Sequence, residues 1–286
     1  WRETPLVFSC QGEPLVGVLT QPQGTSSDVG AVVVVGGPQV RAGSHRQFVS
    51  LARSLATQGH AALRFDVRGM GDSGGEARDF TTLDDDIDSA IQAFTQPPSA
   101  PRRLVLVGLC DGASAALMYW QRRRDTRVAG LCVLNPWLRS DVGQARTQVK
   151  HYYVQRLLQP AFWRKLLSGG VGLRAVGDLG HNLRRARGAV DDGAALASES
   201  FRDTMAGGWR SFSGPLMLVL SGNDYTAKEF LDGVGREPAW RGALEKPGLT
   251  RVDLPDADHT FSKPGDKRAC ENAITGWLDQ VAATRG

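Results

Sequence analysis

The feature that most constrains this chain is an apolar segment followed at once by a tight turn and a helical pattern. Arg103-Leu104-Val105-Leu106-Val107 runs into Gly108-Leu109-Cys110-Asp111-Gly112, and the helical pattern begins at Asp111. This order predicts a strand, a sharp turn and a helix, with Cys110 held in strained backbone torsions and little room for bulk two positions to either side. We therefore expect a thiol at the tip of the turn.

The thiol of Cys110 has two interpretations. At a helix N-terminus, exposed backbone N–H groups favour a thiolate, so we expect a pKa below the ~8.5 of a free cysteine, as suits a nucleophile. Alternatively, Cys110 is a small buried hydrophobe, as free cysteines often are. Cys10, Cys132 and Cys270 are widely spaced and form no C-x-x-C motif, so we expect neither a zinc site nor a disulfide framework.

Length and composition favour one large domain, or a domain with an insertion. The chain has 286 residues, of which 41% are hydrophobic and 22% charged, which disfavours disorder. The formal net charge of +4 is dispersed, so we expect no nucleic-acid partner. The apolar runs are shorter than the ~20 residues of a membrane span. No signal segment follows Trp1, so we expect a cytoplasmic protein; because Trp1 is not Met, whether the native N-terminus is longer stays open.

Strand and helix patterns alternate along much of the chain. We expect strands at 13–20, 31–35, 61–67, 103–107, 128–134, 216–221 and 250–254, and helices at 45–58, 83–94, 111–117, after 226 and at 266–281. This alternation predicts an α/β fold with a parallel sheet. The acidic residues Asp84, Asp85 and Asp86 are expected to stabilise a helix start rather than to bind a metal.

The alternation stops between Trp137 and Pro215, where aromatic and basic helical stretches and glycine-rich joints replace it. We therefore predict a core domain of residues 1–137 and 215–286, with residues 138–214 inserted as a helical cap. The segment 138–214 carries twelve Lys and Arg against six Asp and Glu. Such a charge attracts an anionic substrate or an acyl carrier, or belongs to solvated helix faces, and both alternatives stay open.

A thiol nucleophile needs a base, and a group that orients the base. Asp224 follows the strand at 216–221, and we expect it at the carboxyl edge of the sheet, where ligands bind in open α/β folds. It is free to orient a histidine if Thr226-Ala227-Lys228-Glu229 supplies its own capping box; otherwise Asp224 caps the helix. His259 alone among the histidines follows both Cys110 and Asp224, in the order nucleophile, acid, base. Asp256 and Asp258 are alternatives for the acid.

Charge that develops on a carbonyl oxygen needs hydrogen-bond donors. We expect the backbone N–H of Asp111 as one donor, and the second from the loop Gly36-Gly37-Pro38-Gln39. Pro38 occupies the position that usually donates and has no N–H. We therefore expect Gln39 to supply the missing hydrogen bond through its backbone or its side chain.

These residues resemble the α/β-hydrolase superfamily along nearly the whole chain. The resemblance rests on Gly108–Gly112, on Asp66-Val67-Arg68-Gly69-Met70-Gly71-Asp72-Ser73, on Asp224 and on His259. It implies an eight-stranded, mostly parallel sheet with helices on both faces and an inserted cap, and a loop after Asp66 in which Arg68 and Asp72 bond the turn. A thiol in place of serine is similar to dienelactone hydrolases and to some acyltransferases.

More narrowly, five short segments look like the first type of hydrolase associated with the bacterial exosortase A system. They are Gly36–Gln39, Gly43–Phe48, Arg64–Asp66, Leu109–Ser114 and Asn135–Trp137. Because that family is named for its genomic company, the resemblance implies a reaction class without a substrate.

The function that we expect is acyl hydrolysis of an esterase or thioesterase kind, through an acyl thioester on Cys110. One alternative is an acyltransferase that passes the acyl group to an amine or alcohol, and another is a non-catalytic binding protein with the same fold. The substrate would be an acyl-bearing small molecule or an acyl carrier, and we expect no metal or cofactor. Candidate substrate-binding residues, with solvent contact or cap packing as the alternative, are Arg41, Trp137, Tyr152, Tyr153 and Trp163.

Overall fold

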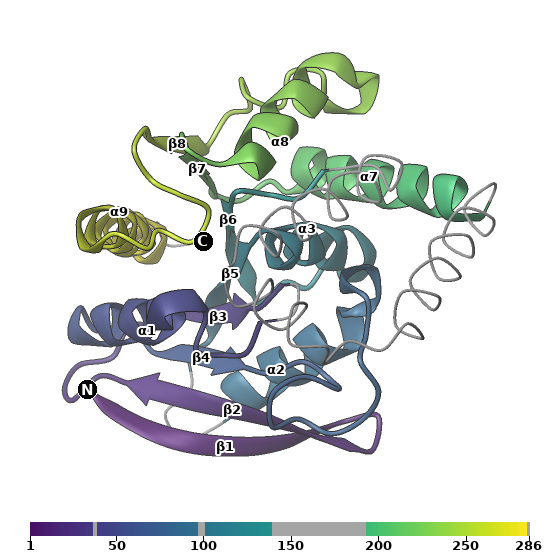
Figure 1. Ribbon diagram of the computed structural model, residues 1–286. Helices are drawn as coiled ribbons and strands as arrows, with labels where there is room; N and C mark the ends of the chain where they lie inside the picture. The colour runs from purple at the N-terminus through teal and green to yellow at the C-terminus, as the bar shows by residue number, and fades with distance from the viewer. Residues whose placement is uncertain (37–38, 97–100, 139–192, 285–286) are drawn as a thin grey trace, which may run out of the picture. The chain divides into compact units, whose positions relative to one another are not determined.

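The computed structural model describes residues 1–36, 39–96, 101–138 and 193–284 of the chain (Figure 1). The chain divides into two compact units, one of residues 1–138 with 203–286 and the other of residues 139–202. Residues 203–214, which we expected in the insertion, therefore group with the larger unit. Most of the segment 138–214 lies outside the described residues, so a helical cap there stays a prediction.

One eight-stranded sheet forms the centre of the larger unit. Its strands are β1 (Arg2–Cys10), β2 (Glu13–Gln21), β3 (Val29–Val34), β4 (Ala62–Phe65), β5 (Arg103–Leu109), β6 (Val128–Leu134), β7 (Leu216–Ser221) and β8 (Leu249–Leu254). The strand order is β1-β2-β4-β3-β5-β6-β7-β8, in which β2 runs antiparallel to both neighbours and the strands from β4 to β8 run parallel. The expectation of an eight-stranded, mostly parallel sheet is confirmed.

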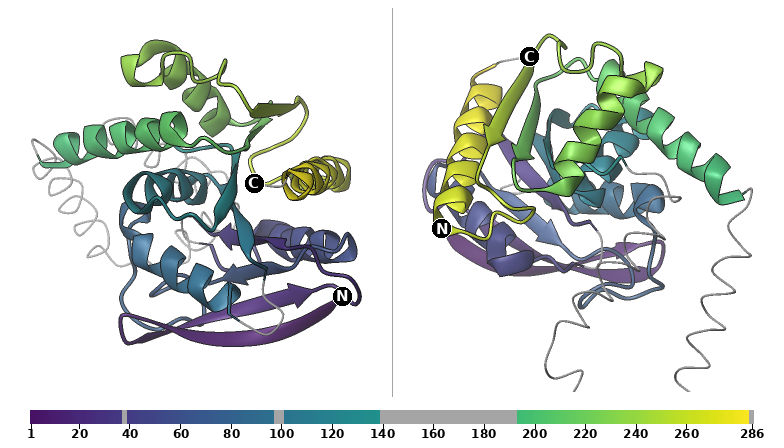
Figure 2. Two further views of the ribbon diagram at one scale, coloured as in Figure 1. Left: turned by 180° about the vertical axis from the view of Figure 1, so that it is seen from behind. Right: turned by 45° about the horizontal axis from the view of Figure 1, so that its top comes forward.

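The α-helices in the described part of the chain are α1 (Gln47–Thr57), α2 (Asp84–Phe94), α3 (Asp111–Arg123), α7 (Gly193–Ser211), α8 (Tyr225–Arg236) and α9 (Pro264–Ala283). In two views α1 and α9 lie on one face of the sheet, and α2 and α3 lie on the other (Figures 1 and 2). None of these helices is both long and apolar enough to cross a membrane.

The sheet face toward α1 and α9 is built by alternate residues of the parallel strands. Because side chains alternate between faces, β3 presents Val29, Ala31 and Val33 to one apolar cluster. β5 adds Val105, Val107 and Leu109 to the same cluster, and α1 and α9 cover it. The strands between the two helical layers therefore read as continuous apolar runs, which is the pattern of a sheet buried on both faces.

Several elements differ from the expectations: α3 runs to Arg123 and not only to residue 117, and β4 is shorter than the strand expected at 61–67. We did not anticipate β1, which contains Pro5; proline is tolerated there because β1 is an edge strand. The first helix begins at Gln47 and not at His45, because His45 and Arg46 have φ values of 53° and 58°, outside the helical region.

The acidic run at the start of α2 forms ion pairs. Asp84 pairs with Arg122 at 3.0 Å, and Asp85 pairs with Arg123. Asp86 is fully buried and accepts hydrogen bonds from the guanidinium of Arg68 at 2.6 and 3.0 Å. The expectation that Arg68 bonds the turn after Asp66 is therefore wrong.

Candidate active site

The turn between β5 and α3 holds Cys110 in a strained conformation. Its backbone has φ 58° and ψ −120°, which L residues rarely adopt. A Cβ at Gly108 would lie 2.4 Å from the carbonyl carbon of Gly112, and a Cβ at Gly112 would lie 2.2 Å from the carbonyl oxygen of Val34. The two glycines are required because the backbones of the strand, the turn and the helix approach one another more closely than any side chain permits.

Hydrogen bonds fix this turn to the last residue of β6 and to the loop that follows it. The N–H of Cys110 donates to the carbonyl oxygen of Leu134 at 2.9 Å, and the N–H of Trp137 donates to the carbonyl oxygen of Cys110 at 3.4 Å. The Ser114 hydroxyl donates to the carbonyl oxygen of Trp137 at 2.7 Å. Trp137 thus contributes to the backbone frame around the thiol.

Burial raises the pKa of the Cys110 thiol well above its ordinary value, and the neighbouring carboxylate of Asp111 raises it further. The thiol donates to Asp111 Oδ1 over 3.6 Å. The expectation that the helix N-terminus lowers this pKa is therefore wrong: one N–H of Asp111 favours the thiolate, but burial and the carboxylate outweigh it. Burial and the Asp111 carboxylate thus both disfavour the thiolate of Cys110.

Asp224 and His259 meet through a hydrogen bond at the carboxyl ends of β7 and β8. Nδ1 of His259 lies 2.7 Å from Oδ2 of Asp224, and the side chains are 31% and 6% exposed, respectively. The carboxylate also accepts from the N–H groups of Thr226 and Ala227 at the start of α8. The predicted capping box is therefore wrong: Asp224 both caps the helix and holds the histidine.

Asn135 is a residue of this region whose role sequence reasoning missed. It is fully buried after β6, and its Nδ2 donates to the carbonyl oxygen of His259 at 3.1 Å and to Oγ of Ser221 at 2.9 Å. Its Oδ1 accepts from the N–H of Ser221 at 2.8 Å. Asn135 thereby ties together the ends of β6 and β7 and the His259 loop. Its sequence signal is an asparagine before a proline at the end of a strand. In the structure its φ is 43°, which asparagine adopts more readily than most residues.

Backbone hydrogen bonds also join the loops of Asp224 and His259. The N–H of Gly222 donates to the carbonyl oxygen of Leu254 at 2.9 Å, and the N–H of Asn223 donates to that of Ala257 at 3.0 Å. The acid and the base are therefore held by a braced pair of loops, as a preorganised site requires.

The two alternative acids, Asp256 and Asp258, are not bonded to His259 in the described part of the chain. Asp258 accepts from the N–H groups of Thr260 and Ser262, each at 3.0 Å, and so shapes its own loop. Burial raises the pKa of Asp258, but a hydrogen bond from the Ser262 hydroxyl and those from the two N–H groups outweigh burial and lower the pKa. Asp256 is exposed. Within the described part of the chain, the carboxylate hydrogen bonded to His259 is that of Asp224.

Cys110 follows the carboxyl end of β5, and Asp224 and His259 follow the carboxyl ends of β7 and β8, so the three residues lie along the same edge of the parallel sheet. The backbone N–H of Asp111 also lies against the thiol. Gln39 is partly buried in the segment after β3, whereas Pro38 lies outside the described residues. The oxyanion role of Gln39 therefore stays a prediction.

The expected substrate-binding residues differ in their surroundings, and three of them lie outside the described residues. Arg41 pairs with Asp66, which is fully buried, and with Asp72, so its guanidinium is occupied by two carboxylates. Trp137 is partly buried beside the turn. Tyr152, Tyr153 and Trp163 lie outside the described residues. In the part of the chain that the structure describes, no three His, Cys, Asp or Glu side chains gather as a metal site.

Comparisons with known proteins agree with this architecture. A family model described as "Alpha/beta hydrolase family" matches residues 31–267. No protein with a curated description matches the sequence. Among solved structures, the alpha/beta hydrolase GrgF from Penicillium sp. sh18 is 18% identical with a TM-score of 0.65, over 99% of this chain and 100% of that one. The esterase Pf2001 from Pyrococcus furiosus is 13% identical with a TM-score of 0.66, over 98% of this chain and 93% of that one. The esterase domain of a Rhodothermus marinus protein is 19% identical with a TM-score of 0.60, over 98% and 99%.

Proposed function

Because this chain belongs to the alpha/beta hydrolase family, we propose that it is an acyl hydrolase in which Cys110 is the nucleophile, His259 the base and Asp224 the residue that orients the base. The observation that carries the proposal is the 2.7 Å hydrogen bond between His259 and Asp224, at the sheet edge where a strained turn presents Cys110. A thiol, an imidazole and a buried carboxylate in this order are the components of acyl transfer by covalent catalysis.

The first half-reaction forms an acyl thioester. Asp224 accepts the hydrogen bond of Nδ1–H, which leaves the lone pair of Nε2 on His259 free to take the thiol proton. As the proton leaves, Sγ of Cys110 attacks the carbonyl carbon of an ester or thioester. The negative charge passes to the carbonyl oxygen, which in this mechanism accepts a hydrogen bond from the N–H of Asp111. The carbonyl re-forms, and the leaving alcohol or thiol takes the proton from His259.

The second half-reaction releases the acid. His259 takes a proton from water, the hydroxyl oxygen attacks the thioester carbon, and the same N–H donor holds the oxygen that becomes charged. The bond to Sγ breaks and the thiolate recovers its proton from His259. The raised pKa of Cys110 favours this return to the neutral thiol.

Transfer to an amine or alcohol is the second candidate, and the thiol nucleophile favours it. A thioester reacts readily with such nucleophiles, so an acceptor bound near Cys110 competes with water. The two outcomes separate when increasing amounts of an amine are added to a turnover reaction. Hydrolysis predicts that the free acid remains the product, whereas transfer predicts that the amide replaces it.

Kinetics of matched variants test the proposal. With 4-nitrophenyl acetate and the acetyl thioester of N-acetylcysteamine, we expect Cys110→Ala, His259→Gln and Asp224→Asn each to lose a factor of about 10³ or more in kcat/KM. Asp256→Asn, a carboxylate on the same loop as His259 that faces solvent, is the matched control and keeps near-normal activity. Wild-type rates in Asp224→Asn, or equal losses in Asp224→Asn and Asp256→Asn, contradict the proposal.

The proposal includes three further predictions, on the subfamily, on the cap, and on the location and substrate. The segments Gly36–Gln39, Gly43–Phe48 and Asn135–Trp137 support a place among exosortase-associated hydrolases. The basic segment 138–214 is proposed to face the substrate as a cap, and the chain is proposed to act in the cytoplasm on a small acyl compound or an acyl carrier.

A further inference from the structure

A cleft of about 300 Å³ lies on the surface between α1 and α9, and its lining does not include the residues of the candidate active site. It is formed by the turn before α1, by α1 itself and by the start of α9, and the residues that line it are His45, Arg46, Val49, Ser50, Arg53 and Lys267. Every ionisable side chain in this lining is basic, and no Asp or Glu is among the described residues that form it. We call it the basic cleft. Its volume lies at the small end of the range for ligand sites.

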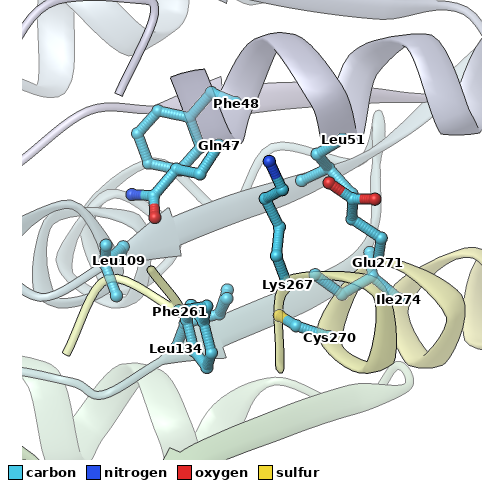
Figure 3. Close-up of a pocket in the computed structure, with 10 residues that line it drawn as sticks. All are labelled: Gln47, Phe48, Leu51, Leu109, Leu134, Phe261, Lys267, Cys270, Glu271 and Ile274. Carbon is cyan, nitrogen blue, oxygen red and sulfur yellow. The ribbon is translucent and has the colours of Figure 1, made fainter. Parts of the chain in front are cut away.

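Most of these basic side chains have no acidic partner. In the part of the chain that the structure describes, the side chains of His45, Arg46 and Lys267 form neither a hydrogen bond nor an ion pair. In Figure 3 the side chain of Lys267 extends from α9 toward α1. Arg53 differs, because its guanidinium pairs with Glu3 at 2.7 Å. The cleft therefore presents N–H donors whose charge no carboxylate balances.

The acidic residues of the surrounding elements do not neutralise the basic cleft. α1 contains no Asp or Glu. On α9, Asp266 and Glu271 stand on either side of Lys267 in the sequence, but neither lines the cleft and neither forms an ion pair with Lys267. On β1, Glu3 is held by Arg53. The local charge is therefore positive, which attracts an anion.

The backbone holds His45 and Arg46 in place at the mouth of α1. Their φ values are 53° and 58°, and non-glycine residues adopt such values at a cost in free energy. The preceding Gly43 packs so closely that a Cβ there would lie 2.6 Å from the ring of Phe48. The first turn of α1 has no acidic residue and no side-chain cap. Because the start of a helix favours negative charge, α1 adds to the attraction that the basic side chains exert.

We propose that the basic cleft binds a phosphate group. The inference goes beyond the proposed function and does not depend on it. Arginine donates to phosphate through a planar fork of N–H groups, and lysine adds a compact positive charge. Phosphate offers more acceptor oxygens and more charge than a carboxylate, so it suits a cleft in which Arg46 and Lys267 face one ligand from two helices.

Protection from phenylglyoxal, which modifies arginine, tests the proposal on the whole chain. We expect inorganic phosphate, at an ionic strength held constant with sodium chloride, to slow the modification of Arg46 several-fold in a saturable way. Arg268, which is exposed on α9 and does not line the cleft, is the internal control and should react at an unchanged rate. Peptide mass spectrometry follows both sites. Equal slowing of the two arginines, or no slowing of Arg46, overturns the proposal.

Matched variants of α9 test the contribution of the second helix. Lys267→Gln is expected to raise the phosphate concentration for half-protection of Arg46 by about tenfold, because a charge-assisted hydrogen bond is lost. Arg268→Gln removes the same charge from the next position and should leave that concentration in place. Equal shifts in the two variants would mean that phosphate responds to net charge only, which overturns a defined site.

Acetyl thioesters of coenzyme A and of N-acetylcysteamine identify the source of the phosphate. They carry the same acyl group, but only coenzyme A carries phosphates. A preference for coenzyme A that Arg46→Gln abolishes assigns the cleft to a phosphate of the acyl donor. Equal use of both thioesters, with Arg46 still protected by phosphate, assigns the cleft to a separate phosphate compound. A lack of acylation by either thioester would refute the proposed function and leave the protection result intact.

Discussion

The Asp111 carboxylate lies beside the thiol of Cys110, whose S–H donates to Oδ1 over 3.6 Å. A negative charge next to the nucleophile opposes thiolate formation, and burial acts in the same direction. In our proposal the thiolate therefore forms only as His259 takes the proton, and a permanent ion pair of thiolate and imidazolium is disfavoured. Such an arrangement protects the thiol from oxidants and alkylating agents, which react with the thiolate.

At this residue we predict that Asp111→Asn lowers the pKa of Cys110. The substitution removes the neighbouring charge and leaves the backbone N–H in place, so the thiolate becomes more favourable. The rate of alkylation by iodoacetamide, followed against pH by mass spectrometry, is expected to rise at lower pH than in the wild type. Asp256→Asn is the control and should leave the profile in place. An unshifted profile in Asp111→Asn contradicts the assignment.

The turn between β5 and α3 is an element that two glycines make possible. We predict that Gly112→Ala destabilises the protein by ~3 kcal/mol or prevents folding, because the new Cβ would lie 2.2 Å from the backbone oxygen of Val34. Gly276→Ala is the matched control: Gly276 is exposed in α9 with nothing within 4 Å of the new atom. It is expected to stabilise by roughly 0.5–1 kcal/mol, since alanine favours a helix over glycine. Urea denaturation measures the free energy of unfolding of both variants. A Gly112→Ala protein of wild-type stability would contradict the prediction, because it would show that the backbone moves away from the new Cβ without loss of stability.

Elements with a local sequence signal could be predicted, and contacts between distant segments could not. The strand, the turn at Cys110 and the following helix are encoded in adjacent residues. The start of α1 was misplaced because residues 45 and 46 adopt positive φ without being glycine. Asn135 forms hydrogen bonds to Ser221 and His259, which lie 86 and 124 residues away in the sequence. The spacing of apolar residues along the chain cannot predict such contacts. The raised pKa of Cys110 likewise depends on burial, which only the folded chain supplies.

At the scale of the whole molecule, the pair of Arg68 and Asp86 joins three parts of the fold. Arg68 follows β4 and Asp86 lies in α2, and both side chains are buried. The backbone N–H of Arg68 also donates to Asp86 at 2.8 Å, and its guanidinium donates to Gln11 between β1 and β2 at 2.8 Å. The hydrogen bonds that the Arg68 guanidinium donates to Asp86 raise the pKa of Arg68 against the opposing effect of burial, so they favour the cation.

We predict that Asp86→Asn destabilises the protein by about 3–5 kcal/mol, because it leaves a buried guanidinium without its counter-charge. Asp85→Asn, at the neighbouring position, removes an exposed ion pair with Arg123 and should cost less than about 1 kcal/mol. Thermal and urea unfolding of the two variants provide the comparison. Equal stabilities would mean that the buried pair does not hold these elements together.

The most direct measurement is the mass of the intact protein, quenched early in its reaction with an activated acetyl ester. The account predicts one acetyl group, mapped by peptide analysis to Cys110, which disappears on longer incubation and never forms in Cys110→Ala. Cys10, Cys132 and Cys270, which are buried, serve as internal controls and remain unmodified. Turnover of the ester at the wild-type rate by Cys110→Ala, or an acetyl group on a residue other than Cys110, would contradict the central claim that this cysteine carries the acyl group.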